Sequence, residues 1–222
     1  MDCIITAAGK NSRMINDFIK MNEEPIHKLK LEINNKPILI HTIEKVLNSN
    51  IENIIITLGH FKDELYDVLE EYDLLDKVTI KINPELNVDL SKTIENSIKD
   101  NPDNYYLFMA ADQPTITSQT INNLINIIDN SENPENTLSV LRRRKTGWLD
   151  TAEGLGMPFC CYGKLLYKYL IDENSNLNPI LRKMIKNDVK FYAVKEVNNF
   201  ELMNINHYQD YLTIKKEFEK NN

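Results

Sequence analysis

Two small residues and a glycine follow the first apolar segment and open a polar stretch, Ala7-Ala8-Gly9-Lys10-Asn11-Ser12-Arg13-Met14. Small residues let the backbone pass close to a ligand, and successive N–H groups in such a turn can bind an anion. Arg13 adds a planar guanidinium that matches the oxygens of a phosphate. We interpret this stretch as a phosphate-binding loop, although, taken alone, an ordinary strand-to-helix turn explains it equally well. It matches neither GxGxxG nor GxxxxGK[ST].

A carboxylate ends a second apolar segment, where Tyr105–Ala110 is followed by Ala111-Asp112-Gln113-Pro114. Ligands of open α/β sheets bind beyond the carboxyl ends of the strands. Mg²⁺ is typically held there by one or two carboxylates, with phosphate oxygens and water as further ligands. Asp112 is therefore a candidate metal ligand. The alternative for an isolated aspartate at this position is a helix cap or a turn residue.

These two segments resemble motifs of GT-A-like nucleotidyltransferases, and of the MobA-like NTP transferase family in particular. The first is similar to the loop AAGxGxRM or AAGxSxRM, with Asn11 in place of the second Gly or Ser. Asn tolerates a left-handed backbone better than most residues. The second is similar to the GDQP block of molybdenum-cofactor cytidylyl- and guanylyltransferases, which carries the metal-binding aspartate. Lys28 stands at the position of the family's triphosphate-binding lysine, and Asn35-Lys36-Pro37 matches its GKP.

Three further blocks follow in the family's order. Asn83–Thr93 resembles NPxxxxGxSxS beside the nucleotide, with Asp89 where a Gly is usual, and Gly156–Phe159 resembles GxPxxF near the acceptor. Leu202–Tyr211 resembles a terminal NINTPEDL block, although His207-Tyr208-Gln209 replaces Thr-Pro-Glu. That resemblance implies Asn206 as the second metal ligand, with Asn204 as the next choice.

Taken together, the resemblance implies catalytic roles for Arg13, Lys28 and Asp112 and Mg²⁺ ligation by Asp112 and Asn206. The residues that it implies for nucleotide binding are Ala7, Ala8, Gly9, Lys10, Asn11, Ser12, Arg13, Lys28, Asn83, Ser91 and Asp112.

Short β-branched segments alternate with segments of helical periodicity, which favours a parallel sheet covered on both faces. The predicted strands are Asp2–Thr6, Asn53–Leu58, Lys77–Ile82, Tyr105–Ala110, Thr137–Leu141 and Val189–Val194. The predicted helices are Pro37–Asn48, Lys62–Tyr72, Leu90–Asp100, Ser118–Asp129, Lys164–Ile171, Asn178–Lys186 and Tyr208–Lys220. Ser118 is the expected N-cap of its helix. We expect the long stretch between Arg13 and Lys28 to be either a mobile flap over the nucleotide or an insertion.

A single α/β domain follows, Rossmann-like and three-layered (α/β/α), with a mostly parallel central sheet, as in GT-A-like nucleotide-diphospho-sugar transferases. We expect residues 1–142 to form the nucleotide-binding half and residues 143–222 to supply the acceptor-binding part. The polar run Arg142–Lys145, where this change occurs, is either a solvated face or a contact for an anionic partner or acceptor.

The composition excludes several classes of protein. With 222 residues, 42% hydrophobic and 27% charged, the chain is typical of a soluble globular domain. A net charge of −7 argues against general nucleic-acid binding. Neither a secretion signal nor a membrane span is visible, so we expect a cytoplasmic protein. Cys160 and Cys161 are interpreted as apolar strand residues, because the three cysteines offer no disulfide or zinc pattern.

The expected reaction is transfer of NMP from a nucleoside triphosphate to a phosphorylated small-molecule acceptor, with Mg²⁺ as cofactor. The molybdenum-cofactor type is favoured. A sugar-, polyol- or choline-phosphate cytidylyl- or uridylyltransferase is the alternative enzyme, with Trp148, Tyr162 and Tyr167 available for a choline-binding aromatic box. A noncatalytic nucleotide-binding regulator is the alternative from another class.

Overall fold

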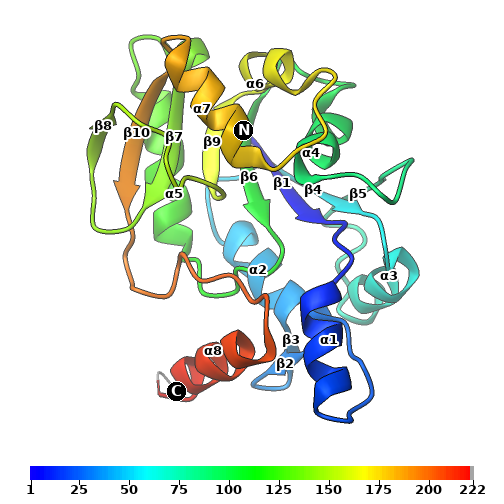
Figure 1. The fold of residues 1–222 in the computed structure, drawn as a ribbon. Helices are drawn as coiled ribbons and strands as arrows, with labels where there is room; N and C mark the ends of the chain where they lie inside the picture. Colours follow the sequence, from blue (N-terminus) through cyan, green and yellow to red (C-terminus); the bar gives the residue numbers. More distant parts are fainter. Residues whose placement is uncertain (221–222) are drawn as a thin grey trace.

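Eight strands form the central sheet in the computed structural model, which describes residues 1–220 (Figure 1). The strand order is β5-β4-β1-β6-β9-β7-β10-β8. The bounds are β1 Asp2–Ala7, β4 Asn53–Leu58, β5 Thr79–Ile82, β6 Tyr105–Ala110, β7 Thr137–Arg142, β8 Gly147–Leu149, β9 Phe159–Tyr162 and β10 Lys190–Lys195. Only β8 and β9 pair antiparallel to their neighbours. The predicted mostly parallel sheet is therefore confirmed.

Helices cover both faces of the sheet, because successive side chains of a strand point to opposite faces. In β1, Cys3 and Ile5 are fully buried in one apolar cluster, which includes helices α2, α3, α5 and α8. Ile4 is fully buried in a second cluster with α4, α6 and α7. The helix bounds are α2 Ile38–Leu47, α3 Lys62–Glu71, α4 Leu90–Ile98, α5 Ser118–Asp129, α6 Gly163–Leu170, α7 Leu177–Lys186 and α8 Tyr208–Lys220. The three predicted layers are thus present.

Most predicted elements agree with the structure to within two residues. The N-cap prediction for α5 is wrong by one residue: the hydroxyl of Thr117, not that of Ser118, accepts from the N–H of Thr120 at 3.1 Å. Ser118 is already the first helical residue, and its hydroxyl donates to the carbonyl of Lys45 at 2.8 Å. The interpretation of Cys160 and Cys161 is confirmed, because both are fully buried free thiols in β9 and burial raises the pKa of each.

The stretch after the first loop is largely a helix, α1 (Ser12–Lys20). It lies beside the start of α8 (Figure 1), where the rings of Phe18 and Tyr208 are 5.4 Å apart. The carboxylate of Asp17 accepts from the backbone N–H of Tyr208 at 3.0 Å and from Nδ1 of His207 at 2.9 Å. These bonds lower the pKa of Asp17 and fix α1 to the C-terminal segment.

A two-stranded hairpin and a short 3₁₀ helix complete the N-terminal half. The hairpin strands are β2 Glu32–Ile33 and β3 Lys36–Pro37, and the 3₁₀ helix η1 is Lys28–Lys30. Asn34 and Asn35 both have positive φ angles, 51° and 59°, as a tight two-residue hairpin turn requires. Among residues 1–220, no helix combines the length and the apolar character needed to cross a bilayer.

Candidate active site

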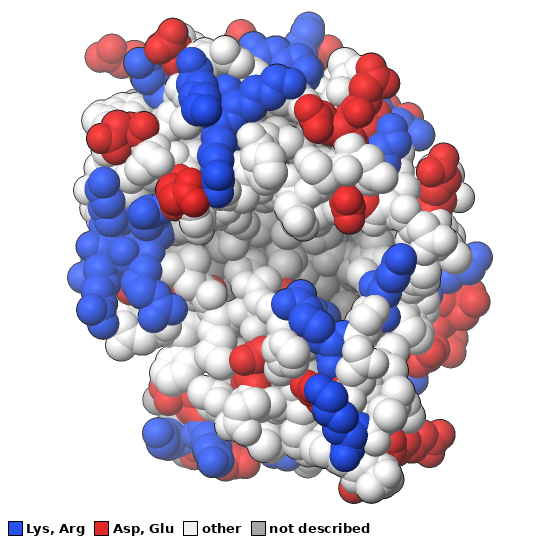
Figure 2. All heavy atoms as spheres, in the orientation of Figure 1, with Lys and Arg blue, Asp and Glu red and all other residues white. Residues whose placement is uncertain are grey.

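A cleft of about 290 Å³ opens where β1 and β6 end at the same edge of the sheet. Parallel register brings these ends together, since Thr6 of β1 pairs with Ala110 of β6. Figure 2 shows the hollow on this face of the molecule. Its lining comes from six segments: Thr6–Gly9 and Arg13, His27–Leu29, Val88, Leu90 and Thr93, Ala110–Asp112, Met157, and Asn204 and Asn206.

The first loop forms one wall of the cleft through Ala7, Ala8, Gly9 and Arg13. A Cβ placed on Gly9 would meet no protein atom within 4 Å, so the loop leaves open space at that point of the wall. Gly59 supports the loop from behind, because a Cβ there would lie 2.8 Å from that of Ala8. Lys10 and Ser12 are exposed and lie outside the lining.

Asn11 holds the turn that leads from this loop into α1. Its φ angle is 57°, a left-handed conformation that glycine or asparagine adopts most readily. Its Nδ2 donates to the carbonyl of Ile26 at 3.3 Å, while Oδ1 is buried and has no hydrogen-bond partner within residues 1–220. Asn11 therefore fits the backbone position that the family fills with a Gly or Ser.

Lys28 and Asp112 meet at the centre of the cleft as an ion pair between Nζ and Oδ2. Both side chains are largely buried, with 19% and 9% exposed. Asn204 donates from Nδ2 to the second carboxylate oxygen of Asp112 at 3.0 Å, and its Oδ1 accepts from Gln113 at 3.3 Å. Three segments that are distant in the sequence thus converge on one buried carboxylate.

Asn206 reaches the same cleft from the segment before α8. Ile205 is fully buried, and its backbone N–H donates to the carbonyl of Asp112 at 3.1 Å. Its neighbours Asn204 and Asn206 both line the cleft. The side chain of Asn206 forms no hydrogen bond within residues 1–220, whereas that of Asn204 is engaged with Asp112 and Gln113.

The donor set around Asp112 fits Mg²⁺ bound together with phosphate. Mg²⁺ takes one or two carboxylates and completes its octahedron with substrate phosphates and water. Asp112 supplies the carboxylate, and the amide of Asn206 supplies a neutral oxygen. Within residues 1–220, no group of three His, Cys, Asp or Glu side chains could hold a metal ion.

His27 lines the cleft but is not suited to proton transfer at neutral pH. Burial, followed by the charges of Lys28 and Lys30, lowers its pKa to about 3. Its Nδ1 accepts from the backbone N–H of Leu29 at 3.3 Å, and its ring lies 4.7 Å from that of Phe61. The imidazole is thus neutral and supports the backbone beside Lys28.

Asn83 and Ser91 do not line the cleft, and neither do Lys10, Asn11 and Ser12 of the first loop. Ala7, Ala8, Gly9, Arg13, Lys28 and Asp112 are the residues predicted for the nucleotide that do line it. Asn83 is buried and donates to the hydroxyl of Thr93 at 2.9 Å. The fully buried hydroxyl of Ser91 accepts from the N–H of Ser175 at 2.8 Å, which fixes the α6–α7 loop to the start of α4. Thr93, which matches the other hydroxyl position of the NPxxxxGxSxS block, reaches the cleft itself.

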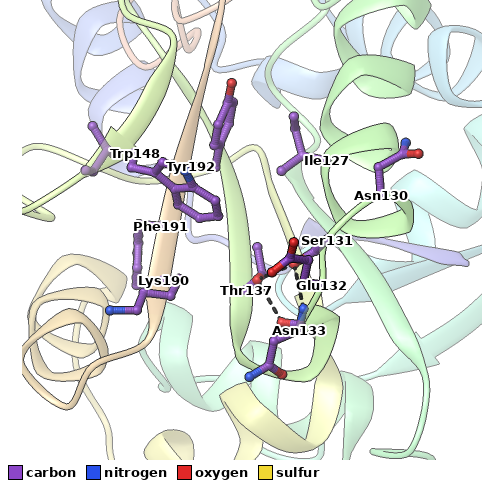
Figure 3. A pocket seen from close by; sticks show the side chains of 11 residues that line it. Ile127, Asn130, Ser131, Glu132, Asn133, Thr137, Trp148, Lys190, Phe191 and Tyr192 are labelled. Atoms are coloured by element: carbon purple, nitrogen blue, oxygen red, sulfur yellow. Dashed lines mark hydrogen bonds between the residues drawn. The ribbon is translucent and has the colours of Figure 1, made fainter.

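The aromatic residues considered for a choline-binding box are dispersed. Trp148 lies on β8 with its ring 5.1 Å from that of Tyr192. Tyr162 donates to Asp103 at 2.7 Å and pairs with Tyr105 at the start of β6, the end away from the cleft. Trp148, Leu149, Phe191 and Tyr192 instead line a separate cavity of about 720 Å³, here called the aromatic groove (Figure 3).

Glu201 is a further residue that reasoning from the sequence missed. It is fully buried and accepts from the N–H and hydroxyl of Thr117, from the hydroxyl of Thr120 and from the N–H of Val197. These bonds fasten the segment that carries Asn204 to the start of α5. The only signal in the sequence is its position three residues before Asn204, which does not reveal burial.

A loop that is open at Gly9, a lysine and a carboxylate at the carboxyl edge of a parallel sheet are typical of a nucleotide-binding site in an α/β enzyme. The comparisons identify the class more narrowly: residues 3–185 match the MobA-like NTP transferase domain, and the chain belongs to that family. It is a nucleotidyltransferase by family and by structural relationship.

Solved structures of nucleotidyltransferases share the fold. A nucleotidyl transferase from Methanothermobacter is 32% identical over 100% of this chain and 98% of its own, with a TM-score of 0.90. Rv0371c from Mycobacterium tuberculosis, solved in complex with manganese, is 13% identical over 97% of each chain, with a TM-score of 0.69. 4-diphosphocytidyl-2C-methyl-D-erythritol synthase from Anaerococcus prevotii is 15% identical over 98% of this chain and 95% of its own, with a TM-score of 0.70.

Among curated proteins, the bifunctional protein GlmU of Francisella tularensis is 19% identical over 100% of this chain and 52% of its own length. The chain therefore spans about half the length of the curated relatives it matches.

Proposed function

We propose that this protein transfers NMP from a nucleoside triphosphate to a phosphorylated small-molecule acceptor, with Mg²⁺ bound at Asp112 and pyrophosphate as the second product. The observation that carries the proposal is the convergence of Lys28, Asp112 and Asn204 beside a loop that is open at Gly9. A cation, a carboxylate and exposed backbone are the groups that a triphosphate with a metal ion requires.

In this proposal the triphosphate lies along Ala8–Arg13. Arg13 and Lys28 are the cations that line the cleft, and they neutralise the phosphate oxygens. The ammonium of Lys28 has three N–H donors, and in this proposal it turns from Asp112 toward the phosphate when the triphosphate binds. That movement frees the carboxylate of Asp112 for Mg²⁺.

Asp112 and Asn206 are the proposed metal ligands. The side-chain oxygen of Asn206 is available, whereas Asn204 already bonds to Asp112 and Gln113 and is better suited to orient the carboxylate. When bound, Mg²⁺ neutralises and orients the triphosphate.

The reaction is an in-line displacement at the α-phosphorus. An oxygen of the acceptor phosphate forms the new P–O bond, the bond from the α-phosphorus to the bridging oxygen breaks, and pyrophosphate leaves with the electron pair. Such a displacement depends on positioning and charge neutralisation. An acceptor phosphate is already ionised near pH 7, which agrees with a cleft whose only histidine is held neutral.

A molybdenum-cofactor acceptor is the favoured choice on the family relationship. A choline-phosphate acceptor is disfavoured, because Trp148 and Tyr162 do not line the cleft. Sugar or polyol phosphates stay as the alternative, and a screen can separate them.

The test is a pyrophosphate-release screen that combines each common NTP with molybdopterin, sugar phosphates and polyol phosphates in the presence of Mg²⁺. We expect one pair to release pyrophosphate and Asp112→Ala to abolish the release. Asp76→Ala, an exposed aspartate with no hydrogen bond or ion pair within residues 1–220, is the matched control and should behave as the parent. A fully active Asp112→Ala protein would refute the proposal.

A further inference from the structure

Four consecutive basic residues lie at the same edge of the sheet as the cleft: Arg142 ends β7, and three more follow in the turn to β8. β6, β7 and β10 all run in the direction of β1, so their carboxyl ends lie at one edge. β7 is the second strand from β6, with β9 between them. Neighbouring strands are about 4.8 Å apart, so the end of β7 at Arg142 lies about 10 Å from the end of β6 across the sheet.

A continuous wall joins the two places. Met157 lines the cleft, and the carbonyl of the next residue, Pro158, accepts from the N–H of Leu141 at 3.1 Å. Arg142 follows directly and donates from Nη1 to the carbonyl of Glu153 at 2.8 Å. A ligand that extends from the cleft past Met157 therefore reaches the basic turn.

A hydrogen bond holds the backbone of this turn, whereas three of its charged side chains have no partner within residues 1–220. Arg144 has a φ angle of 56°, and its N–H donates to the buried carboxylate of Glu196 at 2.6 Å. The side chains of Arg143, Arg144 and Lys145 are exposed and form no ion pair or hydrogen bond within residues 1–220. Three unpaired cations on a rigid turn are unusual in a chain whose net charge is −7.

Figure 2 shows basic side chains gathered at one side of the hollow, over the region where the ends of β7, β8 and β10 lie in Figure 1. We propose that Arg143, Arg144 and Lys145 form a second anion subsite, which binds an anionic group of the acceptor about 10–15 Å from the phosphate that becomes nucleotidylated. This inference rests on the proposed function. It defines the acceptor class as an elongated molecule with a phosphate at one end and a second anion at the other.

Two physical consequences follow. A compact acceptor such as a short polyol phosphate cannot reach from the cleft to the basic turn. Its affinity therefore gains nothing from Arg143, Arg144 and Lys145. Because the cations are exposed, their contribution falls as ionic strength rises.

The experiment titrates the full chain, in Mg²⁺ buffer, with three probes: 1,10-decanediol bisphosphate, 10-hydroxydecyl phosphate and 1,3-propanediol bisphosphate. Calorimetry gives the affinity. The fluorescence of Trp148, the only tryptophan of the chain and three residues beyond Lys145, reports binding at the turn. We expect the long bisphosphate to bind at least about tenfold more tightly than either of the other two probes. We also expect it to cause the largest change in the fluorescence of Trp148.

The triple variant Arg143→Gln/Arg144→Gln/Lys145→Gln should lose that advantage and keep the parent's affinity for NTP. The matched control, Lys77→Gln/Lys99→Gln/Lys216→Gln, removes three exposed lysines that also lack ion pairs within residues 1–220, and it should retain the advantage. Equal affinities of the parent for the two ten-carbon probes, or an unchanged advantage in the triple variant, would overturn the inference. If the parent protein neither binds NTP nor releases pyrophosphate, the proposed function is overturned instead.

Discussion

The cleft at the end of β1 and the aromatic groove beside β8 differ in volume and, more importantly, in how their polar groups are arranged. The groove is the larger, about 720 Å³ against about 290 Å³. Its polar groups pair with one another, as Ser131 does with Thr137 at 2.8 Å (Figure 3). In the cleft, Lys28, Asn204 and the backbone of Ile205 all converge on Asp112.

The difference follows from topology. The carboxyl ends of the parallel strands β1 and β6 bring loops from distant parts of the sequence to one point. The groove lies instead against β8, a three-residue strand at the edge of the sheet, and its lining comes from residues 127–137, 148–149 and 190–192. Convergent charges, and not size, therefore distinguish the proposed reaction site, and the following predictions test that contrast.

Lys28 should give the largest effect on activity. Replacing it in Lys28→Met removes the cation of the triphosphate, and we expect kcat/KM to fall by about 10²–10³-fold. Steady-state pyrophosphate release measures this. The matched control is Lys30→Met, whose exposed ammonium pairs with Glu64 at 3.1 Å and lies outside the cleft. If kcat/KM falls equally in both variants, the loss comes from the lower net positive charge of this region and not from the specific position of Lys28 in the cleft.

His27 should make stability depend on pH. Its pKa is about 3 in the folded protein and about 6.5 when unfolded, so the unfolded chain takes up a proton first as the pH falls. This contribution to stability is present above pH 6.5 and is lost progressively between about pH 6.5 and pH 3, at up to about 1.4 kcal/mol per pH unit. Urea unfolding at pH 7, 6 and 5 gives the unfolding free energy of the parent and of His27→Gln. We expect this free energy to change less with pH in the variant than in the parent. The same pH dependence of the unfolding free energy in both proteins would contradict the low pKa of His27 in the folded protein.

Glu201 should affect stability and the cleft together. In Glu201→Gln one carboxylate oxygen becomes an NH₂ group that faces donors, which costs about 1–3 kcal/mol of unfolding free energy. Because Asn204 lies three residues further on, we also expect weaker Mg²⁺-dependent NTP binding, measured by calorimetry. Glu52→Gln, with 73% of the Glu52 side chain exposed, should change neither quantity appreciably.

The contrast between the two regions also explains what the sequence could predict. Six strands and most helices follow from local periodicity, and the loop, Lys28 and Asp112 follow from motifs. The short strands β2, β3, β8 and β9 are not among the predicted strands. Helix α1 is not among the predicted helices, although its buried residues Met14 and Phe18 stand at helical spacing. The roles of Glu201 and of Ser91 depend on burial and on distant partners, which no local pattern encodes.

Asn11 offers a smaller, local test of the cleft wall. Ala at a φ angle of 57° costs about 1–2 kcal/mol, whereas Gly adopts that conformation readily. We therefore expect Asn11→Ala to lose about that much unfolding free energy and to bind NTP more weakly. Asn11→Gly should stay close to the parent, since it loses only a 3.3 Å bond to Ile26. Equal behaviour of the two variants would show that the left-handed turn is unimportant.

Trp148 should give the smallest effect, and for that reason it tests the comparison most directly. Its side chain is 61% exposed, so Trp148→Ala removes contact with Tyr192 without opening a buried cavity. We expect a change in unfolding free energy within about 1 kcal/mol, and unchanged kcat/KM for pyrophosphate release. A choline-binding box or an acceptor held in the aromatic groove requires the opposite, a raised KM for the acceptor with NTP binding intact. Such a result would move the acceptor from the edge beside Met157 to the groove, and the larger cavity would be a functional site after all.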